Sequence, residues 1–421
     1  MILGSPAPID VQRELAAMRA ELAEIRVAQR EEWIDRERAK DMRAVVADVM
    51  ADSATRASFA TDGATTGYEN GAFIRSGDGN WMFKIGVMNQ VRFVYNNASN
   101  QPSVDNKWGM ETHRVNLTLS GTIIDPSVQW LALASYNSQP DRFVERAQEV
   151  VMQYSWICKD FGDGFSATAG LQNVPWDIES TFYGSSKITA GEYSAFNYRF
   201  GTGKNTGITG KYQCDSWRVT GGTFSQLDTR STGWNSRINL SYAFAMRAEA
   251  KIGATWKEVE LQSSLPGSTP GVLFGLGTLW SNGRADNPET PPTPASQGFT
   301  ADVRTTLSGT TLIAQFALMK DPAGLQTLEW ASGINMQGST FITDDFQVFA
   351  EGSWMDTAGV PWIAQVGANV YFSQRKVKFT NRIIVPFGSG DINGIREVAG
   401  GFGLANYGNN VSLVSQLQLL F

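Results

Sequence analysis

Apolar and polar residues alternate along the chain in long runs that begin at Trp81. In the first run one face holds Trp81, Phe83, Ile85, Val87, Val91, Phe93 and Tyr95, and the other holds Lys84, Gln90 and Arg92. Successive side chains of a β-strand point to opposite faces, so this pattern predicts a strand of about 15 residues. Strands in soluble sheets average about 5–6 residues, whereas a tilted membrane-spanning strand needs about 9–11. The length therefore favours a membrane barrel.

The alternation recurs often enough to predict sixteen antiparallel strands. Their ranges are 81–95, 110–123, 127–137, 148–158, 164–172, 204–213, 216–224, 235–245, 247–258, 298–308, 311–320, 327–337, 341–354, 361–372, 375–386 and 410–421. Short connections near residues 125, 160–163, 214 and 308 predict the periplasmic turns, because an even strand number puts both barrel ends on that side. The apolar segment 271–280 does not fit this up-and-down order, and we assign it to a long loop.

The first 60 residues follow a helical period instead. Two stretches show the 3-4-3 spacing of a coiled-coil seam: Leu15, Met18, Leu22 and Ile25, and then Ala39, Met42, Val46 and Val49. The charged stretch 29–40 between them predicts a stutter, so residues 8–58 are expected to form one helix in a coiled coil. A single solvated helix is the alternative. The predicted organisation is a periplasmic helix over 1–60, a linker over 61–80 and a barrel over 81–421.

Composition excludes several classes of protein. Charged residues make up 18% of the chain and aromatic residues 11%, which is unlike a disordered protein. No run approaches the 18 apolar residues of a membrane-spanning helix, and two cysteines do not make a disulfide scaffold. The weakly acidic balance argues against nucleic acid as a partner. The sequence therefore predicts an all-β transmembrane barrel of about sixteen antiparallel strands, preceded by an N-terminal α-helical coiled coil.

The last predicted strand carries a second signal. Its outward face holds Val411, Leu413, Leu417, Leu419 and Phe421. A final strand that ends in Phe resembles those of bacterial outer-membrane proteins, in which the insertion machinery reads the terminal aromatic residue. We therefore expect Phe421 to be an insertion signal and the outer membrane to be the location. Tryptophans near strand ends share the lipid-facing parity, which favours interfacial girdles over an aromatic sugar slide in the pore.

Three segments resemble the phosphate-selective porin O/P family. They are HRVNLTLSGTIID at 113–125, AGLQNVPWDIES at 169–180 and SAFNYRFGTGKNTGITGKY at 194–212. The likeness covers roughly 81–421 and implies a sixteen-stranded trimeric porin with inward-folded loops, which in this family can carry an N-terminal coiled coil. The family's phosphate-specific members have Arg and Lys along the pore. The corresponding loop here, 173–203, holds Lys187 and Arg199 against Asp177, Glu179 and Glu192.

Strand parity sorts the charges into a predicted filter. The basic residues on the polar face are Lys84, Arg92, Arg114, Arg218, Arg237, Arg247, Lys251, Arg304, Lys376, Lys378 and Arg382. The acidic residues on that face are Glu149, Glu249, Asp302, Glu329 and Glu351. A net positive wall predicts an anion preference, because charges in the lumen attract ions of opposite sign. The alternative is that these charges pair across strands and leave a weakly selective pore.

These features predict a passive diffusion porin for small hydrophilic solutes, with an anion preference. The expected partners are two further copies in a homotrimer, outer-membrane lipid, the insertion machinery and, through the helix, peptidoglycan or another cell-wall component. A tether between membrane and cell wall is the rival function, and a phosphate- or anion-specific channel is a narrower variant. We expect neither a metal nor another cofactor. An enzyme is not expected either, because His113 is the one histidine of the chain.

Overall fold

The computed structural model describes residues 63–69, 71–97, 107–137, 150–225, 242–282, 296–320, 330–356, 362–372, 376–387 and 411–421, together with residue 19. Two compact units divide the chain near residue 65. The predicted helix over 8–58, with its seam residues Leu15, Met18, Leu22, Ile25, Ala39, Met42, Val46 and Val49, lies outside the described residues.

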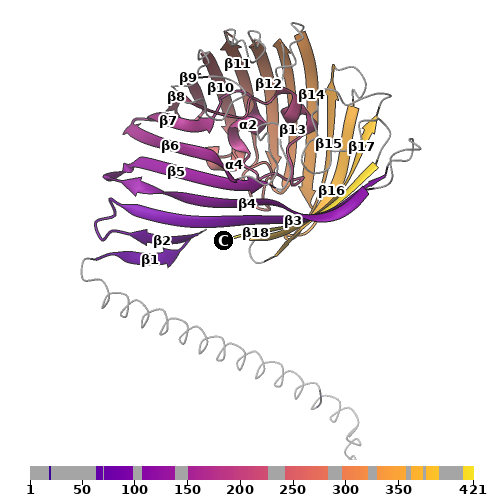
Figure 1. Cartoon of the computed structure of the whole chain (residues 1–421), viewed down its shortest axis with the longest axis horizontal. Helices are drawn as coiled ribbons and strands as arrows, with labels where there is room; N and C mark the ends of the chain where they lie inside the picture. The colour runs from indigo at the N-terminus through magenta and orange to yellow at the C-terminus, as the bar shows by residue number, and fades with distance from the viewer. Residues whose placement is uncertain are drawn as a thin grey trace, which may run out of the picture. The chain divides into compact units, whose positions relative to one another are not determined.

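Sixteen antiparallel strands form a closed barrel, and each pairs with its neighbours in the sequence (Figure 1). The first eight are β3 (Met82–Asn97), β4 (Lys107–Ile123), β5 (Asp125–Asn137), β6 (Val150–Gly162), β7 (Phe165–Asn173), β8 (Lys204–Gln213), β9 (Trp217–Phe224) and β10 (Ala243–Gly253). The others are β11 (Gly271–Ser281), β12 (Ser296–Leu307), β13 (Thr310–Lys320), β14 (Trp330–Phe341), β15 (Phe346–Met355), β16 (Trp362–Phe372), β17 (Val377–Phe387) and β18 (Val411–Leu420). The last strand closes the ring by pairing with the first, with Gln418 opposite Gln90.

The predicted strand number is confirmed, but two of the predicted strands are wrong. The ranges 235–245 and 247–258 contain one described strand, β10, which ends at Gly253. Residues Trp256–Val259 form a short helix, α4, held by a capping box between Thr255 and Glu258. The segment 271–280, which the sequence assigns to a loop, forms strand β11 instead. Its lumen face carries Leu273 and Leu279, both buried, so apolar residues occupy both faces and the alternation disappears.

Over most of the described wall the polar face points inward and the apolar face outward. On β3, Gln90 and Arg92 are buried inside the barrel, whereas Ile85 is 38% exposed on the outer surface. A lipid-facing barrel requires this arrangement, because lipid cannot hydrogen-bond a polar side chain. No helix of the described ranges is long and apolar enough to cross a membrane.

The predicted linker contains two short strands, β1 (Thr65–Tyr68) and β2 (Ala72–Arg75). The strands pair with each other, and β2 pairs with the first residues of β3, so that Ala72 lies opposite Ile85. Strand β18 occupies the same edge of β3 further along, from Met88 onward. The hairpin therefore extends the sheet beside the end of the last strand.

Two β-bulges interrupt the regular alternation at the middle of the wall. On β4, the pairing steps from Arg114 to Thr112 and leaves His113 as the extra residue. On β6, it steps from Tyr154 to Met152 and leaves Gln153. A bulge shifts the parity of a strand, so two consecutive residues can face the same side. His113 and Arg114 are accordingly both buried.

Candidate functional site

The interior of the barrel holds a long inward-folded segment, residues 174–203, between β7 and β8. It contains two short helices, α2 (Ile178–Phe182) and α3 (Ala195–Phe200). Each begins at a side-chain cap: Asp177 accepts a hydrogen bond from the Ser180 amide at 2.9 Å, and Ser194 accepts one from the Asn197 amide at 2.9 Å. These caps satisfy amide groups that a short helix leaves without partners.

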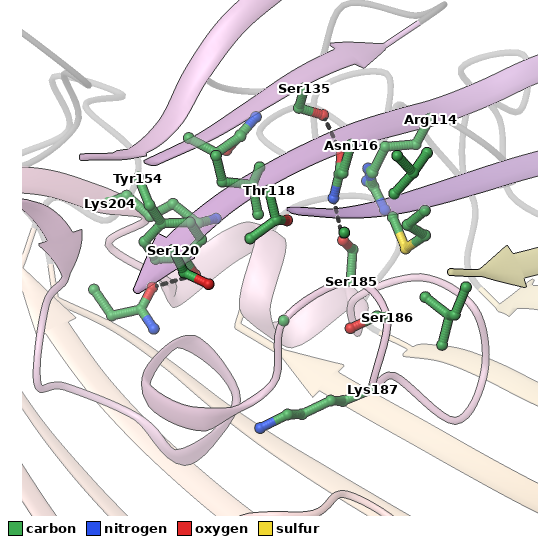
Figure 2. A pocket seen from close by; sticks show the side chains of 18 of the residues that line it. Arg114, Asn116, Thr118, Ser120, Ser135, Tyr154, Ser185, Ser186, Lys187 and Lys204 are labelled. Carbon is green, nitrogen blue, oxygen red and sulfur yellow. Dashed lines mark hydrogen bonds between the residues drawn. The ribbon is translucent and has the colours of Figure 1, made fainter. Parts of the chain in front are cut away.

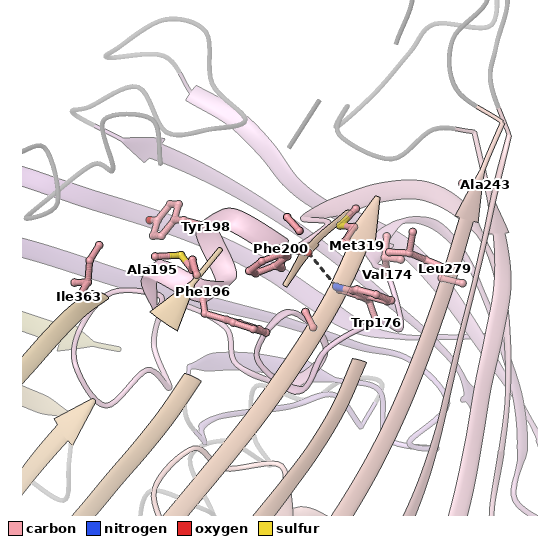
Figure 3. Close-up of a cluster of buried hydrophobic side chains, with 14 of the residues drawn as sticks. Val174, Trp176, Ala195, Phe196, Tyr198, Phe200, Ala243, Leu279, Met319 and Ile363 are labelled. Atoms are coloured by element: carbon pink, nitrogen blue, oxygen red, sulfur yellow. Dashed lines mark hydrogen bonds between the residues drawn. The ribbon is translucent and has the colours of Figure 1, made fainter. Parts of the chain in front are cut away.

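An apolar core fixes this inward segment to one side of the barrel (Figure 3). Trp176, Phe196 and Phe200 are fully buried against small or apolar wall residues such as Ala243 and Ala317. The Trp176 indole N–H donates to the Phe200 carbonyl oxygen at 3.0 Å, which satisfies its polar atom inside the core. An apolar core like that of a soluble protein therefore fills the lumen beside β10–β17.

Glycines of the wall make room for this core. A Cβ at Gly277 would lie 2.2 Å from the Trp176 carbonyl oxygen, and one at Gly298 would lie 2.5 Å from the Trp176 ring. Contacts of that length are steric clashes, so any side chain at these positions would displace Trp176. These glycines serve close packing, and both lie on strands whose backbone conformation is ordinary.

A second segment meets the first from the opposite end of the barrel. Residues 254–270, which connect β10 to β11, place Val259 and Gln262 in the interior. The Gln262 side-chain oxygen accepts from the Thr189 amide at 2.6 Å, and its nitrogen donates to Gln337 of β14 at 2.7 Å. The two segments together close the same part of the lumen.

Glu192 joins the inward segment to the bulge of β4. Its carboxylate lies 2.7 Å from His113 Nε2, 3.4 Å from Arg114 and 3.7 Å from Arg92. The Tyr198 hydroxyl donates to it at 2.9 Å. Burial alone would raise the pKa of Glu192, but the neighbouring cations Arg114 and Arg92, with His113, hold that pKa well below its usual range.

A second ion pair fastens the start of the inward segment. Arg247 makes two hydrogen bonds with Asp302, at 2.6 and 2.8 Å, and donates to the Trp176 carbonyl oxygen at 3.2 Å. The guanidinium of Arg218 lies 4.5 Å from the Phe182 ring and 4.3 Å from the Trp256 ring, so it links the two interior segments.

Glu179 of α2 is a buried carboxyl group without a cationic partner in the described interior. It accepts hydrogen bonds from the Ser194 amide at 2.7 Å and from the Gln315 side chain at 3.3 Å. Burial and the neighbouring carboxylate of Glu351 raise the pKa of Glu179 to about 8. Its charge state therefore changes near neutral pH.

The remaining space forms a cavity of about 610 Å³ between the β3–β8 wall and the inward segment (Figure 2). Five cationic side chains line it: Lys84, Arg114, Lys187, Lys204 and Lys376. No Asp or Glu side chain of the described residues lines it. Hydroxyl and amide groups occupy most of the other positions, and Figure 2 shows Asn116, Thr118 and Ser120 along one strand with Ser185 and Ser186 facing them.

The predicted filter residues fall into three groups. Lys84, Arg114 and Lys376 line the cavity. Six others face the interior segments or wall partners and are buried: Arg92, Arg218, Arg247, Arg304, Lys378 and Arg382. Among them, Lys378 donates to the Ile188 carbonyl oxygen at 2.6 Å and Arg382 to Gln365 at 3.1 Å. Lys251 lies 5.4 Å from the Trp256 ring, and Arg237 is outside the described residues. Pairing between strands, the alternative to a filter, accounts for Arg218 with Glu249 and for Arg247 with Asp302.

Sequence reasoning missed Lys204 as a lining residue and His113 as a contact of Glu192. Lys204 is the first residue of β8, and strand parity does not predict that a side chain at this position lines a cavity. His113 and Arg114 are consecutive, so a strict period of two puts them on opposite faces. Only the bulge brings both to Glu192, and a single sequence carries no clear signal for it.

Comparisons with known proteins find similar folds but no similar sequences. No family model and no curated protein matches the sequence. The structure of OmpF from Salmonella typhi in complex with daunomycin superposes with a TM-score of 0.55 at 11% identity, over 85% of this chain and 100% of that chain. A mutant porin of Rh. blastica gives 0.49 at 12% identity, over 81% and 100%. OmpT of Vibrio cholerae gives 0.48 at 12% identity, over 81% and 98%.

The likeness to OmpF establishes a shared porin-type β-barrel fold. At 11% identity it carries the fold alone. Membership of the phosphate-selective porin O/P family stays a prediction, because no family model matches the sequence.

Proposed function

We propose that the protein is a passive outer-membrane channel for small hydrophilic solutes, with a preference for anions. The observation that carries the proposal is the cavity, which follows the part of the wall that the interior segments leave open. A barrel with a polar interior and an apolar outer face suits this role, because solutes then cross without meeting lipid. The inward segment sets the size limit.

The lining of the cavity supports the anion preference. Lys84, Lys187 and Lys376 have no carboxylate of the described residues within salt-bridge distance. A low-dielectric wall concentrates the field of such charges and raises the local concentration of anions. Three of the buried arginines, Arg92, Arg218 and Arg247, contribute little to this field, since Glu192, Glu249 and Asp302 neutralise them.

Assembly and location are part of the same proposal. The resemblance of the sequence favours a homotrimer in the outer membrane, with Phe421 as the signal for the insertion machinery. Phe421 directly follows β18, and its amide donates to the Val87 carbonyl oxygen of β3 at 2.9 Å. An aromatic residue at this position suits recognition of the final strand.

Reconstitution of the purified full chain tests the channel proposal. In planar bilayers of neutral lipid we expect discrete conductance steps, grouped in threes if the trimer inserts as a unit. Liposomes that carry the protein should swell in small sugars and sugar acids and should exclude larger oligosaccharides. A folded preparation that shows neither conductance nor swelling would contradict the proposal.

A further inference from the structure

We infer that the cavity selects hydroxylated organic anions of the sugar-acid class over simple anions and over neutral sugars. The inference rests on the proposed function and adds a substrate class to it. It comes from the way in which cations and neutral hydrogen-bonding groups alternate along the lining, not from the number of positive charges.

One wall of the cavity combines a cation with a row of hydroxyl groups. Thr118 and Ser120 follow one another on the lumen face of β4, about 7 Å apart by the rise of a strand. Lys84 stands directly opposite Ser120 on β3. A six-membered sugar ring over the two hydroxyls would therefore place a carboxylate substituent beside Lys84.

These groups are available to a solute. Within the described part of the chain, neither the Thr118 nor the Ser120 hydroxyl bonds another protein group. Asn116, by contrast, is held in place: it donates to Ser185 at 3.2 Å and accepts from Ser135 at 2.6 Å. The fixed amide marks the end of the open row.

The facing wall has matching chemistry. Ser186 and Lys187 of the inward segment line the same cavity, and Lys187 is exposed (Figure 2). Four tyrosines, Tyr68, Tyr154, Tyr193 and Tyr198, also contribute to the lining, and the last two belong to the inward segment. The apolar C–H face of a sugar ring packs on such rings, while its hydroxyls bond the serines and its carboxylate meets a lysine.

The proposed ligand class follows from this combination. A compact inorganic anion beside Lys84 would reach Ser120 but could not span the row to Thr118, and a neutral sugar would use the row and leave the lysines unused. A hydrocarbon acid would bring its charge but would remove water from Thr118 and Ser120 without replacing the hydrogen bonds, which is unfavourable. The cavity volume of about 610 Å³ lies in the range of roughly 300–1,000 Å³ that is usual for small-molecule sites.

Block of single-channel chloride current tests the inference on the full-length wild-type protein. Three solutes isolate the two features: D-glucuronate carries both charge and hydroxyls, cyclohexanecarboxylate carries the charge and a ring of the same size, and D-glucose carries the hydroxyls. We expect glucuronate to block half of the current at a concentration at least about tenfold below that of either other solute. Cyclohexanecarboxylate lacks one or two of the hydrogen bonds, and glucose lacks the charge.

Variants locate the effect. The double change Thr118→Val with Ser120→Ala keeps the cations and should raise the half-blocking glucuronate concentration about tenfold. The same change should lower the half-blocking concentration of cyclohexanecarboxylate, because no hydroxyl then loses its water without a replacement. Lys84→Gln should weaken both acids equally. Thr206→Val, on the outer face of β8, is the matched control and should change nothing.

The outcomes separate the inference from the proposed function. Equal block by glucuronate and cyclohexanecarboxylate in a conducting wild-type channel would overturn the sugar-acid inference and leave the channel proposal intact. Absence of any conductance would overturn both. The wild-type comparison of the three solutes decides the matter even if a variant fails to fold.

Discussion

The Nε2 atom of His113 lies 2.7 Å from the carboxylate of Glu192, and both side chains are fully buried. His113 is the extra residue of a β-bulge in the wall, and Glu192 belongs to the inward segment 174–203. This contact, with Arg92 and Arg114 beside it, joins the wall next to the open cavity to the segment that bounds it. The irregular position in the strand therefore sets where the inward segment lies.

Replacement of Glu192 by Gln should release this attachment. The change removes the carboxylate that Arg92, His113 and Arg114 share, and breaking a buried ion pair costs about 3–5 kcal/mol. We expect hydrogen exchange of the amides in 178–200 to accelerate while the strands keep their protection. Peptide-resolved exchange measured by mass spectrometry reads this directly.

Asp345→Asn supplies the control for that experiment, because Asp345 is an exposed carboxylate in the turn between β14 and β15. It should leave exchange in the inward segment unchanged. Equal protection in wild type and Glu192→Gln would show that the apolar core alone holds the segment.

A methyl group at Gly277 should also disturb the segment, from the opposite wall. The added carbon would meet the Trp176 carbonyl oxygen at 2.2 Å, and overpacking of this kind costs about 1–3 kcal/mol. Gly277→Ala should lower the guanidinium midpoint of unfolding and increase current fluctuations. Gly210→Ala, where no heavy atom lies within 4 Å of the new carbon, should behave as wild type.

The packing of the inward segment should weaken as pH rises. The pKa of Glu179 is raised to about 8 by burial and by Glu351. A carboxyl group whose pKa is higher in the folded than in the unfolded state adds stability while protonated, and that contribution is lost as pH rises through the folded-state pKa. Current fluctuations should therefore increase as pH rises from about 4.5, the ordinary pKa of Glu, to about 8, and should level off above that.

Glu179→Gln should reduce this dependence on pH over the same interval, because the amide stays neutral. Glu258→Gln changes a carboxylate of the exposed capping box, and the pKa of Glu258 lies far lower, at about 2, through hydrogen bonds from Thr269 and Thr255. That variant should keep the wild-type pH response. A flat wild-type profile would contradict the role assigned to Glu179.

Regular alternation made most of the barrel predictable from sequence. The strands near 81–95, 311–320 and 361–372 lie within a few residues of their predicted bounds, because lipid on one side and polar groups on the other impose a period of two. The alternation did not predict strand β11, because the inner face of this strand contacts an apolar segment instead of water. Leu273 and Gly277 then look like lipid-facing or loop residues, and no local signal corrects this.

The interior was less predictable, because it depends on contacts between distant parts of the chain. Parity places Arg92 and Arg247 on the inward face, where the structure has them, yet both bond carboxylates that only the folded chain brings near them. The polar period says which side chains point inward. It does not say which of them the inward segment covers.

The reversal potential under a potassium chloride gradient tests the central claim most directly. The account predicts a chloride-selective wild-type channel whose selectivity falls toward zero in the triple variant Lys84→Gln, Lys187→Gln and Lys376→Gln, which removes three lining charges. A triple change at Lys159, Lys211 and Lys257, outside the lining, should keep the wild-type value. A cation-selective wild type, or a lining variant with unchanged selectivity, would contradict the account.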